Sequence, residues 1–306
     1  MTGLTLAGLV ACSPALPPPG AGQRPELRPA MAPAPAAETP ASLAARAHYA
    51  RVQSLLLSQG LLRTDGGGPD TPYTDRMLAE NFIRIALYDE YARTSGGPVQ
   101  RTTVSRIRKW QAPVRVGLSF GASVPPDRRA ADTARIGSFL ARLSQLTNHP
   151  IALSDANPNF FIQIVSEDER QALGPQIRAA LPGLSPAEVA GITQMPRSTY
   201  CLVYAMSEGA DATYTRAFAV IRSEHPDLLR LSCIHEEITQ GLGLANDSPS
   251  ARPSIFNDDE EFALLTKQDE LMLRILYNPA LTPGLTEDQA RPIVESLAAR
   301  LVGGES

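Results

Sequence analysis

The segment Cys233–Ser248 constrains this chain most, because its spacing fixes both a helix and the side of that helix that carries polar groups. Glu236 and Gln240 are four residues apart, so on a helix they point the same way, with Glu237 beside them. The opposite side is an apolar stripe typical of a helix packed on a core: Leu231, Ile234, Ile238 and Leu242. We therefore expect a helix that is buried on one side and polar on the other.

Gly243 is placed to end this helix, because glycine adopts a left-handed backbone without steric cost. The chain then turns back, so Asn246 or Asp247 can approach the polar side from outside the helix. Zinc prefers imidazole and thiolate ligands, whereas carboxylates and amides suit a hard cation weakly. Two interpretations stay open: a weak site for a divalent cation, or side chains that hydrogen-bond one another with no cofactor.

The spacing resembles the zinc helix of metzincin metalloproteases, H-E-x-x-H-x-x-G-x-x-H. With the catalytic glutamate at Glu237, the glycine falls on Gly243. The three ligand positions then fall on Glu236, Gln240 and Asn246, where histidines should stand. Starting instead at His235 puts a threonine, a leucine and an alanine at the second ligand, glycine and third ligand positions, so we prefer the first register.

Further stretches are similar to the matrixin branch of the metzincins. They are Ser254, Ile255 and Phe256, in place of the Ser-Ile-Met turn under the metal, then Leu265–Asp269 and Leu276–Tyr277. Thr266 and Asp269 also form the pattern of a helix capping box. The resemblance spans about residues 110 to 280. It implies an α+β, zincin-like (matrixin-like) domain, in which a mixed twisted sheet packs against helices that include a degenerate active-site helix.

The pattern E-E-x-x-Q-x-L-G-L-x-N-D-S, from Glu236 onward, is also similar to a proteobacterial family of lipoproteins that contain a domain of unknown function. This second resemblance implies a cell-envelope protein with no established reaction or cofactor.

The N-terminus fits an envelope location, since Leu9–Cys12 matches a bacterial lipobox whose cysteine becomes lipid-modified. Residues 13–41 are rich in proline and alanine and predict an extended tether. The segment before Cys12 lacks the basic region of a signal peptide, so either the start is incomplete or Cys12 is incidental. We expect a signal-like segment (1–12), the tether (13–41), a helical extension (42–98) and a zincin-like domain (99–306). The expected location is the periplasm, and Ser13 after Cys12 indicates an anchor in the outer membrane.

Removing a lipidated Cys12 leaves Cys201 and Cys233 as a pair. In an oxidising compartment an even pair commonly forms a disulfide, which here would join a strand to the key helix. The alternative is two buried free thiols.

The hydrophobic pattern predicts helices at 41–62, 74–94, 127–148, 225–244, 266–277 and 286–302, and a partly helical stretch at 167–181. Strands are expected at 114–120, 160–165, 199–206 and 214–221, the last two as a hairpin. The order of strand, helix, strand, hairpin, helix, turn and helix is that of a zincin-like domain.

The chain has 306 residues and a net charge of −4, without long basic runs, so nucleic acid is not an expected partner. We first expect a non-catalytic protein that binds an envelope protein or peptide and is held to the membrane through Cys12. Two alternatives remain: a metal-dependent hydrolase with Glu237 as general base, and a purely structural envelope protein.

Overall fold

A computed structural model of the chain describes residues 36–94, 97–207, 212–257 and 259–303. Cys12 and most of the expected tether lie outside the described residues, so the lipobox stays a prediction. The described end of the expected tether is held to the body of the protein: the backbone N–H of Ala36 donates to the carbonyl of Ala122, and Thr39 bonds Asp168.

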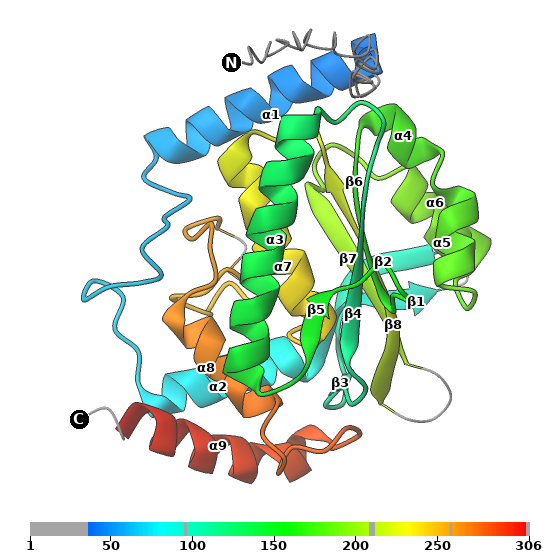
Figure 1. Cartoon of the computed structure of the whole chain (residues 1–306). Coiled ribbons are helices and arrows are strands. Elements are labelled where there is room, and N and C mark those ends of the chain that lie inside the picture. The colour runs from blue at the N-terminus through cyan, green and yellow to red at the C-terminus, as the bar shows by residue number, and fades with distance from the viewer. Residues whose placement is uncertain (1–35, 95–96, 208–211, 258, 304–306) are drawn as a thin grey trace, which may run out of the picture. The chain divides into compact units, whose positions relative to one another are not determined.

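Helices and strands alternate along the chain (Figure 1). The helices are α1 (Pro40–Ser58), α2 (Asp75–Ala86), α3 (Pro126–Thr147), α4 (Glu167–Gln171), α5 (Gly174–Ala180), α6 (Pro186–Thr193), α7 (Asp227–Leu242), α8 (Lys267–Leu276) and α9 (Glu287–Gly303). The strands are β1 (Tyr88–Thr94), β2 (Gly97–Val104), β3 (Lys109–Trp110), β4 (Val114–Phe120), β5 (Ile151–Leu153), β6 (Phe160–Val165), β7 (Cys201–Ser207) and β8 (Thr213–Arg222). In this part of the chain no helix is long and apolar enough to cross a bilayer.

The main sheet runs in the order β5, β4, β6, β8, and β7 pairs with the other side of β8. Strands β4, β5, β6 and β8 are parallel, and β3 pairs in parallel with the first residues of β8. Strand β7 is antiparallel to β8 and, in the described residues, pairs with no other strand. The hairpin β1–β2 forms a separate two-stranded sheet. The α+β class and the β7–β8 hairpin expected from the sequence are confirmed.

Helices cover both faces of the sheet (Figure 1). On one face, α3, α7 and α8 enclose the larger core, which includes Ile136, Phe160 and Ile238. On the other, α5 and α6 pack on β6 and β8 through a smaller core that includes Ile177, Val189 and Phe218. Helix α1 lies across one end of these layers and buries Tyr49 against Leu229 of α7.

The predicted second helix, 74–94, is too long. Helix α2 ends at Ala86, with Leu87 as its C-cap, and Tyr88–Thr94 forms strand β1. Tyr88 fits the helical spacing of the apolar stripe, but pairing with β2 decides the structure, as tertiary context commonly overrides a local pattern. Thr39 caps α1, and helix α6 was not predicted.

Candidate functional site

The key helix, α7, is positioned by two glycines at its end. Gly243 has φ 126°, and a Cβ there would lie 2.3 Å from the carbonyl oxygen of Arg108. A Cβ on Gly241 would lie 2.5 Å from the ring of Phe160 on β6. Because neither position accepts a side chain, the helix approaches the sheet closely and ends where the sequence predicted.

Glu236 and Glu237 lie side by side in the middle of α7, next to the first residue of β7. A carboxylate oxygen from each and the Sγ of Cys201 all lie within 4.8 Å of one another. Glu237 is 2 % exposed, whereas Glu236 is partly exposed. Within the described part of the chain, this is the one group of three His, Cys, Asp or Glu side chains close enough to share a metal ion.

The sulfur of this group is already committed, because Cys201 and Cys233 form a disulfide with Cα atoms 5.9 Å apart. The predicted disulfide is thus confirmed in the structure. A disulfide sulfur is a poor metal ligand, since the thiolate is the form that binds metals. The group therefore offers a cation two carboxylates.

The side chains of Gln240 and Asn246, the two predicted amide positions, do not point to the same place. The Nε2 of Gln240 donates to Asp247 Oδ1 at 3.1 Å, so Asp247 returns toward the helix as expected. Asn246 is buried, and its Nδ2 donates instead to the carbonyl of Arg84 at the end of α2, at 2.8 Å. Asn246 therefore fastens the loop after α7 to α2.

His235 has a structural role. Its ring stacks on Phe139 with centroids 3.9 Å apart, and its Nδ1 accepts a hydrogen bond from the backbone of Leu265 at 3.1 Å. Burial, with a smaller effect from Arg142, lowers the pKa of His235 to about 3. A neutral imidazole thus holds the segment before α8 against α7.

The turn Ser254, Ile255 and Phe256 is buried and is fastened to α8 by Asp269. Ser254 Oγ donates to Asp269 Oδ1 at 2.5 Å, and the Ile255 N–H donates to Oδ2 at 3.1 Å. Thr266 and Asp269 form the predicted capping box. Burial raises the pKa of Asp269 to about 6, although these hydrogen bonds oppose the shift.

The first half of α7 borders a second, largely buried polar cluster, which we call the arginine cluster. Its members are Asp132, Arg170, Arg222, Glu224, His225 and Arg230, which are buried, and the partly exposed Glu167. Arg222 and Arg170 each bond one oxygen of Glu167. Arg230 Nε donates to Asp132 Oδ2 at 3.0 Å, and both side chains are almost inaccessible to solvent.

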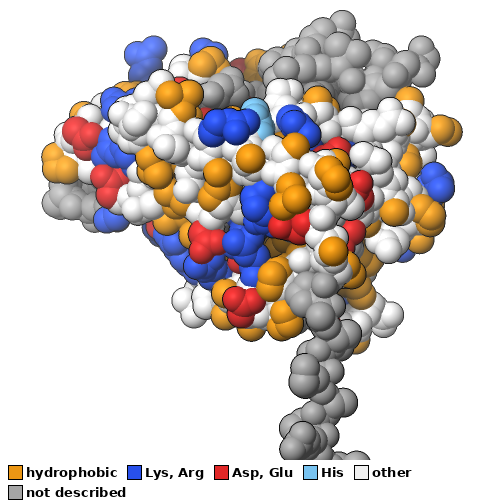
Figure 2. Space-filling view, turned by 90° about the horizontal axis from the view of Figure 1, so that it is seen from above, with side chains coloured by type: hydrophobic (Ala, Val, Ile, Leu, Met, Phe, Trp, Pro, Cys, Tyr) orange, Lys and Arg blue, Asp and Glu red, His pale blue; other side chains and the backbone are white. Residues whose placement is uncertain are grey.

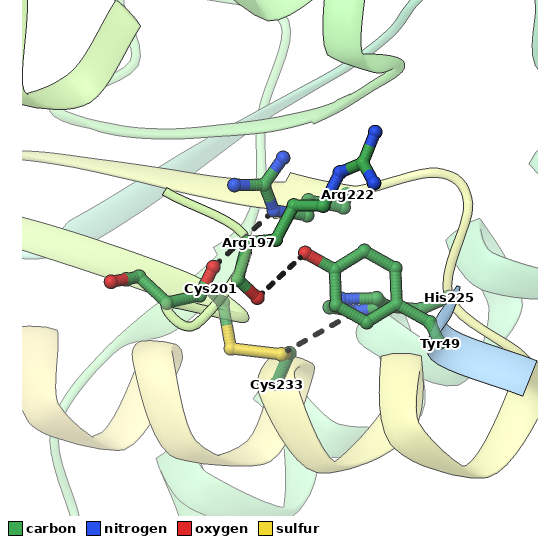
Figure 3. Close-up of a disulfide and its surroundings, with 7 residues drawn as sticks. Tyr49, Arg197, Cys201, Arg222, His225 and Cys233 are labelled. Atoms are coloured by element: carbon green, nitrogen blue, oxygen red, sulfur yellow. Dashed lines mark hydrogen bonds between the residues drawn. A yellow bond between two sulfur atoms is a disulfide. The ribbon is translucent and has the colours of Figure 1, made fainter. Parts of the chain in front are cut away.

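His225 is the member of the arginine cluster that contacts the disulfide. Its Nδ1 is 3.7 Å from Cys233 Sγ, and its ring meets that of Tyr49 edge-on (Figure 3). Burial, followed by the charges of Arg222 and Arg230, lowers the pKa of His225 well below its ordinary value. His225 is therefore neutral in the folded protein.

The sequence analysis did not single out the arginine cluster, although a signal was present. Charged and polar residues, Arg222–Asp227, directly follow the apolar strand β8, and Ser166–Arg170 follows β6. Carboxyl ends of parallel strands meet at one edge of a sheet, so these charges could have been placed together. On the face seen in Figure 2, basic and acidic side chains lie next to one another. Arg128 and Asp227, at the start of α7, form one ion pair, with nitrogen and oxygen 3.5 Å apart.

Comparison with known proteins identifies a family but no characterised relative. The model of a family described as protein of unknown function (DUF2927) matches residues 75–296. No curated protein and no solved structure matches the chain significantly.

Proposed function

Because the chain belongs to DUF2927, a family of proteins of unknown function, we propose a function from its geometry. It is a lipid-anchored envelope protein whose matrixin-like domain binds an extended peptide and performs no catalysis. The anchor is Cys12, and the location is the periplasm.

The order of elements supports the matrixin-like part of this proposal. Strand β4, helix α3, strand β6, hairpin β7–β8, helix α7, an irregular turn and helix α8 follow in the order of a zincin-like domain. The turn at Ser254 is tied to α8 through Asp269, so the segment that resembles the matrixin turn is firmly held.

The observation that carries the peptide-binding proposal is the position of β7. It is antiparallel to its neighbour, pairs with β8 alone in the described residues, and lies against α7 at Glu236 and Glu237. An edge strand can add an extended peptide through main-chain hydrogen bonds, with side-chain pockets giving specificity. Leu202 to Ser207 are all partly exposed, so the strand is accessible along its length.

The residues present do not fit the zinc ion of a matrixin. The ligand positions hold two neutral amides and one carboxylate, and Asn246 is directed to the backbone of Arg84. Without a firmly held cation, Glu237 lacks the activated water that a metallohydrolase needs. Metal analysis of the purified protein checks this: we expect no stoichiometric transition metal, and one tightly bound zinc per chain would restore the hydrolase alternative.

Proline substitutions in β7 test peptide binding. Neighbouring residues of a strand direct their N–H groups to opposite edges. Of the two variants Val203→Pro and Tyr204→Pro, one therefore removes an N–H that faces outward and the other removes an N–H that bonds β8. We expect the variant that loses the outward donor to remain folded and to lose capture of extended peptides from a library. Leu153→Pro, on edge strand β5, is the matched control and should keep the binding, because the bonds of Val114 to Pro150 and of Ser154 to Val116 leave the Leu153 N–H facing away from β4. Equal capture by the wild type and by both folded β7 variants would contradict the proposal.

The anchor is tested separately. Replacing Cys12 by serine should move the protein from the membrane to the soluble periplasmic fraction and leave peptide capture unchanged. A protein that stays in the membrane fraction after this change would contradict the lipid anchor but not the peptide site.

A further inference from the structure

A pocket far from α7 in sequence lies between the ends of α8 and α9. It has a volume of about 380 Å³ and is lined by Arg274, Asn278, Leu297, Arg300 and Leu301. This volume is within the range of small-molecule sites, roughly 300–1,000 Å³. Among the described residues, no carboxylate lines it.

The polar groups of this pocket are hydrogen-bond donors. Arg274 and Arg300 come from different helices, and neither has a hydrogen bond or ion pair with a described residue. Asn278 Oδ1 already accepts from the backbone N–H of Ala280 at 3.0 Å, which leaves the Nδ2 group as its free polar end. Since guanidinium N–H groups only donate, Arg274 and Arg300 offer the pocket donors and no acceptor.

A third cation lies next to the pocket. Lys109 is 8 % exposed, and its Nζ donates to the carbonyls of Leu276 and Asn278 at 2.9 and 3.2 Å. Those bonds occupy carbonyls at the end of α8 and offset the negative end of the helix dipole. Burial lowers the pKa of Lys109 to about 8, so the group is largely charged at neutral pH.

An arginine in the last turn of a helix can also serve that helix alone, by interacting with its carbonyl end. Arg274 and Arg300 both occupy last turns. Interaction with the carbonyl end of one helix does not require two arginines from separate helices to line the same pocket. Leu297 and Leu301 add apolar surface to the pocket, although Leu297 is largely buried in the main core and Leu301 packs against that core.

We propose that this pocket binds a small organic anion, a carboxylate or phosphate that carries a short apolar group. The two guanidinium groups and Asn278 hold the oxyanion, and the two leucines contact the apolar group. The site is separate from β7 and does not depend on the peptide-binding proposal.

Titration calorimetry with three probes tests the pocket: hexanoate, hexyl phosphate and the neutral hexanol. We expect the wild type to bind one or both anions, more weakly at high salt, and not to bind hexanol. Arg274→Gln and Arg300→Gln should each weaken binding about tenfold or more, because bonds to charged groups are the strong ones. Arg300→Lys should recover part of the affinity.

Arg51→Gln is the matched control, since Arg51 is an exposed arginine on α1, away from the pocket. It should bind like the wild type, and all variants should unfold at the same temperature as the wild type. The proposal is overturned if the wild type binds neither anion, if hexanol binds equally well, or if Arg51→Gln weakens binding as much as Arg300→Gln. Loss of thermal stability without loss of binding would assign both arginines to the helix ends alone.

Discussion

The two halves of helix α7 differ in how their polar side chains are used. In the first half, Arg230 and Asp132 are fully buried and paired, and Arg230 also donates to the carbonyl of His225. In the second half, Glu236 and Glu237 place two like charges beside each other, and Glu236 reaches solvent. The first half thus joins α7 to α1 and α3, whereas the second half places two neighbouring carboxyl groups beside β7.

The largest expected effect comes from breaking the pair in the first half. Arg230→Ala leaves Asp132 buried without its partner, and removing one member of a buried pair costs about 3–5 kcal/mol. Denaturant unfolding should show this loss as a lower midpoint.

A double variant distinguishes the contribution of the Asp132–Arg230 pair from that of the other hydrogen bonds of Arg230. Replacing both groups, as Asp132→Asn with Arg230→Met, should recover most of the stability, because an uncharged replacement of a buried pair is often close to neutral. A double variant as unstable as Arg230→Ala would mean that the bonds of Arg230 to His225 and Asp227 matter more than the pair itself.

The disulfide fastens β7 to α7 where the two halves of the helix meet, and it gives the next effect. Replacing Cys201 and Cys233 by serine should cost about 3–4 kcal/mol in the chain-entropy account, since the bond closes a loop of 32 residues. Unfolding of the wild type with and without reductant, compared with the double serine variant, measures it. A reductant effect that persists in the serine variant would have another origin.

Local patterns in the sequence predicted α7, its glycine end and the capping box, because each depends on residues within one or two turns. The predicted position of Asn246 depended on a template, whereas a backbone carbonyl of α2, 162 residues away, decides where its side chain lies. The arginine cluster was missed for the same reason: its partners come from α3, α4, β8 and α7. Strand β1 shows that pairing with a distant segment can overrule a helical stripe.

The next largest effect concerns how the free energy of unfolding depends on pH, because two histidines are buried. His225 and His235 have lowered pKa values when folded, so their contribution to stability is complete above about pH 6.5 and is lost as the pH falls. Asp269 acts in the opposite sense: its folded pKa of about 6 is raised, so its contribution is present below about pH 3.9 and is lost as the pH rises through 6. Between pH 4 and 6 the terms partly cancel.

Asp269→Asn removes the opposing term. The slope of unfolding free energy against pH between 4 and 6 should then increase by about one proton, roughly 1.4 kcal/mol per pH unit. The slope is the quantity to compare, because the substitution also alters the bonds to Ser254 and Thr266. An unchanged slope would mean that the folded protein holds Asp269 ionised throughout this range.

The smallest effect is expected in the second half of α7. Glu236→Gln keeps the shape of a partly exposed side chain and should change the unfolding free energy by no more than about 0.5 kcal/mol, as for most surface substitutions. A loss comparable to that of Arg230→Ala would show that Glu236 supports the fold, and the contrast between the halves would disappear. If stability is retained while peptide capture changes, Glu236 acts in ligand binding rather than in the fold.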